Sequence, residues 1–168
     1  MKGRLVSNTG PIIALSSIDH LEILKRIFEE VIVPEPVHNE IMQGGKDFTG
    51  LGSYRKATWI KVQSLADPIE PLLGTLLDKG EASVIHIARE KGVDFALIDE
   101  RKARKIARKI YGIHVVGSAR ILVEAKHRGF ISNVREALEG MRSAGYWIHD
   151  DIMKMALGQA DEEWGPRE

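Results

Sequence analysis

The chain has 168 residues, of which 43% are hydrophobic and 29% charged, and it contains no cysteine. This length and composition predict one globular domain and exclude disulfides, cysteine nucleophiles and thiolate metal sites. The 24 basic and 24 acidic side chains give a formal charge of zero, so attraction to nucleic acid has to come from local clusters of charge.

Short apolar segments alternate with amphipathic segments along the chain. Apolar or β-branched runs predict strands at 5–6, 31–33, 59–62, 95–98 and 113–116. Helical spacing of apolar residues predicts helices near 12–15, 19–28, 37–41, 67–78, 81–91, 103–110, 118–125, 134–142 and 151–157, with a glycine-bearing loop at 44–52. This alternation predicts an α/β fold with a mainly parallel central sheet. We expect one domain over residues 1–157 and a loosely ordered tail over residues 158–168.

The segment Arg4–Pro11 reads as a short buried strand that runs directly into a helix. Leu5 and Val6 are apolar, and Gly10-Pro11 ends the strand and is able to open a helix. Ligands of open parallel sheets bind at the carboxyl ends of the strands. Asn8, which follows the first predicted strand, is therefore a candidate site residue.

Three acidic residues lie at comparable junctions. Asp99 follows the 95–98 strand, Glu81 lies in the first turn of a helix, and Glu40 lies on the helix after the second strand. Carboxylate and amide oxygens suit Mg²⁺ or Mn²⁺, so the four side chains predict a metal site if the fold gathers them. Taken singly, each has a simpler interpretation as a helix cap, a dipole partner, a turn residue or an exposed residue. Asp94 starts the strand that Asp99 ends, so we expect it at the opposite end of the sheet.

These segments resemble a PIN domain, related to toxin ribonucleases of the VapC type. The resemblance rests on the segments Val-Ser-Asn8-Thr9-Gly-Pro, Val-Pro-Glu-Pro-Val-His-Asn-Glu40, Lys-Gly80-Glu81-Ala82 and Ala-Leu-Ile-Asp99-Glu100-Arg101. It implies a three-layer α/β/α fold and hydrolysis of single-stranded RNA with Mg²⁺ or Mn²⁺. It further implies that Glu40, Glu81 and Asp99 are catalytic acids and metal ligands. A homodimer and an antitoxin partner are also implied, and the absence of cysteine suits a cytoplasmic location.

Asn8 departs from the family pattern, which usually has an aspartate there as a metal ligand. An asparagine still offers a carbonyl oxygen, but it brings no charge, so we expect weaker metal binding and slow cleavage. Glu100 is expected to compensate in part. Thr9 and Ser118 are hydroxyl residues at the same edge and are expected to support the ligands or a phosphate.

Basic residues are densest between Arg101 and Lys109, immediately after Asp99. Arg101 and Arg104 are closest to the strand end and are the predicted RNA contacts, whereas the distal members fit a solvated helix face. None of the six histidines forms a His-x-x-x-His pair, so each is expected to be a packing or surface residue, and only His86, one turn after Glu81, is kept as a weak candidate.

Other α/β functions fit the sequence less well. Gly44-Gly45 lacks the Lys-Ser/Thr of a phosphate-binding loop, and Ser7-Asn8 lacks the paired acids of a phosphoacceptor receiver domain. No long apolar stretch predicts a membrane span or a secretory signal. The sequence therefore predicts a metal-dependent ribonuclease of the PIN type, with a non-catalytic PIN-like module that binds RNA or a protein as the alternative.

Overall fold

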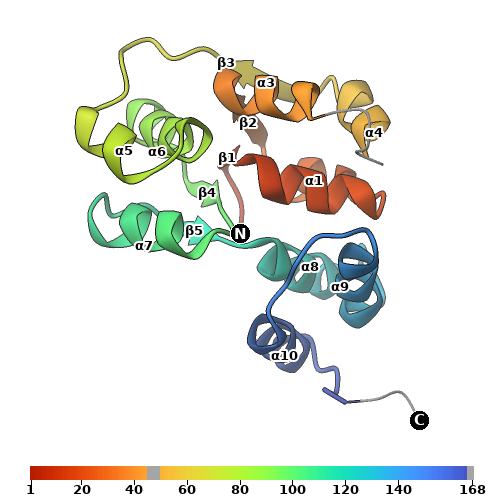
Figure 1. The fold of residues 1–168 in the computed structure, drawn as a ribbon. Helices are drawn as coiled ribbons and strands as arrows, with labels where there is room; N and C mark the ends of the chain where they lie inside the picture. The colour runs from red at the N-terminus through yellow and green to blue at the C-terminus, as the bar shows by residue number, and fades with distance from the viewer. Residues whose placement is uncertain (45–49, 166–168) are drawn as a thin grey trace.

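The computed structural model describes residues 1–44 and 50–165. Within these ranges one sheet contains five strands: β1 (Arg4–Ser7), β2 (Glu30–Pro34), β3 (Ile60–Gln63), β4 (Phe95–Leu97) and β5 (Val115–Val116). The strands lie in the order β3-β2-β1-β4-β5, and every neighbouring pair is parallel. The predicted parallel sheet is confirmed (Figure 1).

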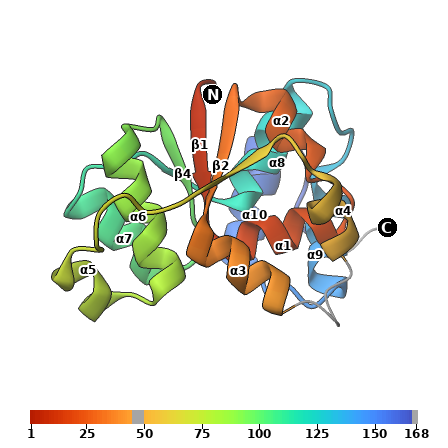
Figure 2. The same ribbon diagram turned by 90° about the horizontal axis from the view of Figure 1, so that it is seen from above.

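Helices cover both faces of this sheet. In the described ranges they are α1 (Thr9–Ser17), α2 (Glu22–Ile27), α3 (Glu35–Gln43), α4 (Leu51–Lys56), α5 (Pro71–Leu76), α6 (Lys79–Lys91), α7 (Arg101–Lys109), α8 (Ser118–His127), α9 (Val134–Ser143) and α10 (Asp150–Gln159). Figure 2 shows the strands between two groups of helices, with α5, α6 and α7 on one side and α1, α2 and α8 on the other. The three-layer α/β/α architecture is confirmed.

The central strands are apolar because both of their faces are covered. Leu5 and Val6 of β1 and Val33 of β2 are fully buried, as are Ala96 and Leu97 of β4. A parallel strand with helices on both faces reads as a continuous apolar run rather than an alternating one. This is why the short runs in the sequence are reliable signals of strands.

The strand order reverses between β1 and β4. The chain builds β1, β2 and β3 outward in one direction and then returns, so that β4 lies beside β1 and β5 lies beyond it. Ser7 aligns with Leu97 in this parallel pair. A reversal of this kind opens a crevice at the carboxyl ends of the strands, which is where open α/β sheets bind ligands. Asn8 and Asp99 follow these two strands.

Several predicted element boundaries differ from those in the structure. The helix predicted at 67–78 is only α5 (Pro71–Leu76), because Asp78 is the N-cap of α6. Asp19 does not cap a helix; it adopts a left-handed conformation with φ of 58°, and α2 begins at Glu22. Residues 45–49 of the loop predicted at 44–52, including Gly45, lie outside the described residues, and Leu51 already belongs to α4.

The C-terminal segment is more ordered than the sequence indicates. Helix α10 continues to Gln159, past the predicted boundary after residue 157. The Glu162 carboxylate accepts hydrogen bonds from Lys126 Nζ at 2.8 Å and from the backbone N–H groups of Val134 and Arg135 at 2.7 and 2.9 Å. This carboxylate therefore ties the segment after α10 to α8 and to the start of α9. Among the described residues, no helix combines the length and apolar character needed to cross a membrane.

Candidate functional site

Asn8 follows β1, at the point where the strand order reverses, and its side chain does not cap helix α1. Its backbone N–H donates to the carbonyl of Leu97 on β4 at 3.0 Å, which continues the pairing of β1 with β4. The residue holds the N-cap position of α1, yet within the described structure its side chain makes no capping hydrogen bond. The Asn8 amide is therefore available to the crevice rather than used in a turn.

Three side-chain oxygens from separate segments surround Gly80. A Cβ atom at position 80 would lie 2.8 Å from Glu40 Oε2 and 3.5 Å from both Asn8 Oδ1 and Asp78 Oδ1. Thr9 fixes one of these oxygens, because its hydroxyl donates to Glu40 Oε2 at 2.8 Å. One oxygen-lined space therefore lies between the end of β1, helix α3 and the start of α6. It stays open because residue 80 is a glycine and has no Cβ atom.

Glu81 starts α6 together with Asp78. Asp78 Oδ1 accepts the backbone N–H of Glu81 at 2.8 Å, and Glu81 Oε2 accepts the backbone N–H of Asp78 at 3.3 Å, which forms a capping box. Burial, and then the neighbouring Asp78 charge, raise the pKa of Glu81 above its ordinary value, and Glu100 adds to the rise. The fold therefore holds several carboxylates close enough to repel one another, which is a common property of cation sites.

Asp99 is held by three donors. Its Oδ1 accepts the backbone N–H of Ser118 at 2.7 Å, and its Oδ2 accepts the Ser118 hydroxyl and the Tyr146 hydroxyl, each at 2.5 Å. Burial, and then the Asp99 charge, raise the pKa of Tyr146, so the phenol stays protonated and donates. These bonds fix the carboxylate at the end of β4.

The predicted basic and supporting residues have different surroundings. Arg104 Nη1 donates to the carbonyl of Ile98 at 2.7 Å, whereas Arg101 is exposed. Glu100, which we predicted to support the site, caps α7, because its carboxylate accepts the backbone N–H groups of Lys102 and Ala103 at 2.9 and 2.7 Å.

Asp94 and His86 have partners outside the candidate site. Asp94 accepts the backbone N–H of Arg4 at 2.7 Å, at the opposite end of β1 from Asn8, as expected. His86 Nε2 lies 3.2 Å from Glu90 Oε2, one turn further along α6.

The donor set fits a hard divalent cation. Asn8, Glu40 and Asp78 present amide and carboxylate oxygens around Gly80, and such oxygens are preferred by Mg²⁺ and Mn²⁺. Across residues 1–44 and 50–165, however, no three Asp, Glu, His or Cys side chains form a group placed to hold one ion. The structure thus brings Glu40 to Asn8, and holds Glu81 in its capping box and Asp99 on Ser118 and Tyr146.

Sequence reasoning missed Asp78 and Tyr146. Asp78 had a usable signal, because Asp-x-x-Glu before an apolar run is the pattern of a capping box. Tyr146 gave none, since it lies in the link between α9 and α10, 47 positions after Asp99.

Comparison with known proteins identifies the family of this chain. The family model described as a PIN domain matches residues 4–162, which include every candidate residue of the site. Searches of curated proteins and of solved structures gave no match. PIN domains have a nuclease-type fold and generally use divalent metal ions. On the match to nearly its whole length, this chain belongs to the PIN domain family.

Proposed function

We propose that this protein is a metal-dependent endoribonuclease that hydrolyses single-stranded RNA. The observation that carries the proposal is the convergence of Asn8, Glu40 and Asp78 oxygens around Gly80, where the strand order reverses. An oxygen-lined space at this position of a PIN domain supports the proposal, because a metal-dependent nuclease needs oxygen ligands for its metal ion.

Four side chains are the proposed ligands of the metal ion. Glu40, oriented by Thr9, and Asn8 would hold Mg²⁺ or Mn²⁺ together with Glu81 and Asp99, the other predicted ligands. When bound, such an ion polarises a phosphate and lowers the pKa of a water molecule. Ser118 and Tyr146 keep the Asp99 carboxylate at the strand end, which limits the reorganisation needed when substrate arrives.

The basic start of α7 is the proposed contact for RNA. Arg104 is half-buried beside Asp99, and its Nη1 is anchored on the Ile98 carbonyl, so its remaining N–H groups are held in a fixed direction. Arg101 is exposed one turn earlier on the same helix. Both would attract phosphates toward the acids, although the chain as a whole has no net charge.

One observation favours the alternative of a non-catalytic module. Asn8 is uncharged, so the site attracts a cation less strongly than four carboxylates would. Titration with Mn²⁺ followed by calorimetry separates the two functions. Binding at or below millimolar concentration supports the nuclease, and no binding at that concentration supports the module.

Cleavage tests the chemistry directly. A mixed pool of single-stranded RNA, incubated with Mn²⁺, should be cut by the wild-type protein and not by the Glu81→Gln variant. This variant keeps an oxygen able to accept the Asp78 N–H, so α6 retains its cap. Equal cleavage by both proteins would point to a contaminating nuclease and would contradict the proposal.

The resemblance to toxin ribonucleases of the VapC type supports a proposal for the cellular setting. We propose a cytoplasmic toxin that an antitoxin protein holds in check, and that acts as a homodimer through the helices before Trp59. Sedimentation at micromolar concentration tests the dimer. Growth arrest on expression, relieved by the neighbouring reading frame, tests the toxin.

A further inference from the structure

A second polar hollow lies beside Gly117, close to Asp99. A Cβ atom at Gly117 would lie 3.0 Å from Asp99 Oδ1 and 2.8 Å from Arg104 Nη1, so the carboxylate and the guanidinium flank the same glycine. Gly117 also lines a pocket of about 180 Å³ together with Arg104, Arg108 and Arg120. The pocket is therefore continuous with the end of the sheet where the candidate acids lie.

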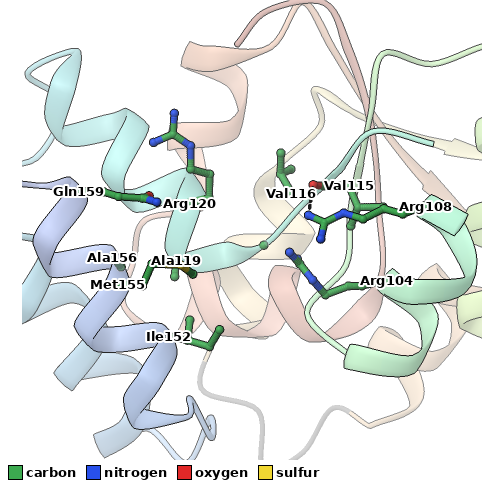
Figure 3. Close-up of a pocket in the computed structure, with 11 residues that line it drawn as sticks. Arg104, Arg108, Val115, Val116, Ala119, Arg120, Ile152, Met155, Ala156 and Gln159 are labelled. Atoms are coloured by element: carbon green, nitrogen blue, oxygen red, sulfur yellow. Dashed lines mark hydrogen bonds between the residues drawn. The ribbon is translucent and has the colours of Figure 1, made fainter. Parts of the chain in front are cut away.

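Three arginines from two helices face this pocket. Figure 3 shows Arg104 and Arg108 reaching from α7 toward the β5 segment, and Arg120 on α8 beside it. Arg108 Nη2 donates to the carbonyl of Val115 at 3.0 Å, which fixes its guanidinium at the sheet edge. Each anchored arginine spends one donor on a backbone carbonyl and keeps others for a ligand.

The positive charge of this pocket is poorly neutralised. None of the eleven described residues that line it is acidic. Arg120 lies 3.7 Å from Glu124, but Glu124 bonds Arg128 more closely, at 2.8 Å. Arg104 and Arg108 lie one turn apart on α7, and both line the pocket. Two like charges held side by side are stabilised by an anion placed between them.

The volume of the pocket and the apolar side chains on its opposite wall limit which anion it can bind. Pockets for whole drug-sized ligands have volumes of about 300–1,000 Å³, so this one is large enough for a phosphate and only part of the group attached to it. Helix α10 forms the facing wall with the exposed apolar side chains of Ile152 and Met155. Arginine forks bind phosphate in a bidentate manner, and an apolar wall suits the sugar or base beside that phosphate. A nucleotide unit of a polymer has both parts.

We propose that the pocket formed by Arg104, Arg108, Arg120 and Met155 binds one phosphate, with part of its nucleoside, of a single-stranded RNA that extends across Gly117 from the acid site. This inference rests on the proposed function, because it assigns the path of the same substrate. The pocket would bind the RNA at a second position, beside β5. This second contact would set the direction in which the RNA runs past Asp99.

A charge placed in the pocket gives the sharpest test. Met155 and Ile110 are both 55% exposed, so Met155→Glu and Ile110→Glu should each leave the fold intact and change the net charge equally. Only Met155 lines the pocket, whereas Ile110 follows the basic helix α7. Binding of a fluorescent single-stranded RNA is measured by anisotropy in EDTA, where no metal-dependent cleavage occurs. We expect Met155→Glu to weaken binding about tenfold and Ile110→Glu less than twofold.

Substitution of the pocket arginines by glutamine is an independent test of the same proposal. Arg120→Gln and Arg108→Gln should each weaken binding about tenfold and lower the slope of log affinity against log salt by roughly 0.7. Lys105→Gln, on the same helix but outside the pocket, should change the affinity less than twofold. Arg120 bonds no backbone carbonyl in the described structure, so its variant remains informative if Arg108→Gln disturbs β5.

The outcomes separate the two proposals. Equal effects of Met155→Glu and Ile110→Glu, or of the arginine variants and Lys105→Gln, would overturn the pocket while leaving the nuclease intact. RNA that binds through the pocket but is never cut by the metal-loaded wild type would contradict the nuclease alone. A wild-type protein that binds no single-stranded RNA would overturn both.

Discussion

The hydroxyl of Tyr146 donates a 2.5 Å hydrogen bond to Asp99 Oδ2, and so joins the α9–α10 link to the end of β4. The same phenol lies against the start of α1, since a Cβ atom at Gly10 would lie 3.0 Å from it. One side chain from the C-terminal part of the chain thus contacts both the end of β4 and the start of α1. It lies 47 positions after Asp99, in a link that contains none of the predicted site residues.

Removal of the Tyr146 hydroxyl should weaken both the fold and the site. Tyr146→Phe deletes a bond to a carboxylate, so we expect the free energy of unfolding to fall by about 1–2 kcal/mol. Because Asp99 loses an orienting partner, Mn²⁺ affinity should fall about tenfold. Urea unfolding and calorimetry measure the two effects.

Tyr111→Phe is the matched control for that substitution. Tyr111 donates to Glu70 at 3.2 Å, far from the acids, and Glu70 is paired with the exposed Arg89. We expect a loss below about 0.5 kcal/mol and unchanged Mn²⁺ affinity. If both variants lost equal stability and equal affinity, Tyr146 would have no special role.

Asn8→Asp should restore the charge that the site lacks. We expect Mn²⁺ to bind about tenfold more tightly, a gain of ~1.4 kcal/mol, and cleavage to become faster. Asn133→Asp is the control, because Asn133 caps α9 away from the crevice and aspartate caps equally well. Unchanged affinity and cleavage in Asn8→Asp would show that the charge argument is wrong.

Gly80→Ala should damage the cation site without harming the helix. The added Cβ would meet Glu40 Oε2 at 2.8 Å and force that carboxylate away from Asn8. We expect Mn²⁺ binding and RNA cleavage to fall at least tenfold, while the circular dichroism spectrum stays that of the wild type.

Gly158→Ala serves as the comparison, because it lies in α10 with no atom within 4 Å of its added Cβ. It should raise the free energy of unfolding by roughly 0.5–1 kcal/mol through helix propensity and leave metal binding unchanged. Metal binding by Gly80→Ala equal to that of Gly158→Ala would remove Gly80 from the site.

The Glu162 anchor should make stability depend on pH. Burial alone would raise the pKa of Glu162, but hydrogen bonds from Lys126 and from the Val134 and Arg135 N–H groups outweigh it and lower the pKa below 4.5. A carboxylate with a lowered folded-state pKa stabilises the fold above its unfolded pKa, and that stability is lost as the pH falls through the folded value.

Glu162→Gln should therefore cost about 1–3 kcal/mol at pH 7 and progressively less below pH 4.5. Thermal unfolding of both proteins across this range measures the difference. Glu163→Gln, at the next and exposed position, should show no such pH-dependent difference. A constant gap between wild type and Glu162→Gln down to pH 2 would contradict the assignment.

The sequence by itself determined the strands, the parallel sheet and the strand-end positions of Asn8 and Asp99. Buried parallel strands must be apolar on both faces, so their signal is local, and parallel crossovers carry all strand ends to one edge. It also contained the Asp78–Glu81 capping pattern, which is local in the same sense.

Only the tertiary structure decided which oxygens surround Gly80, that Tyr146 and Ser118 hold Asp99, and that Arg108 and Arg120 share a pocket with Met155. These contacts join segments separated by 19 to 47 positions in the case of Asp99. They depend on how α3, α6 and α10 pack around the sheet, and no periodicity in the chain records the direction in which a side chain points after that packing.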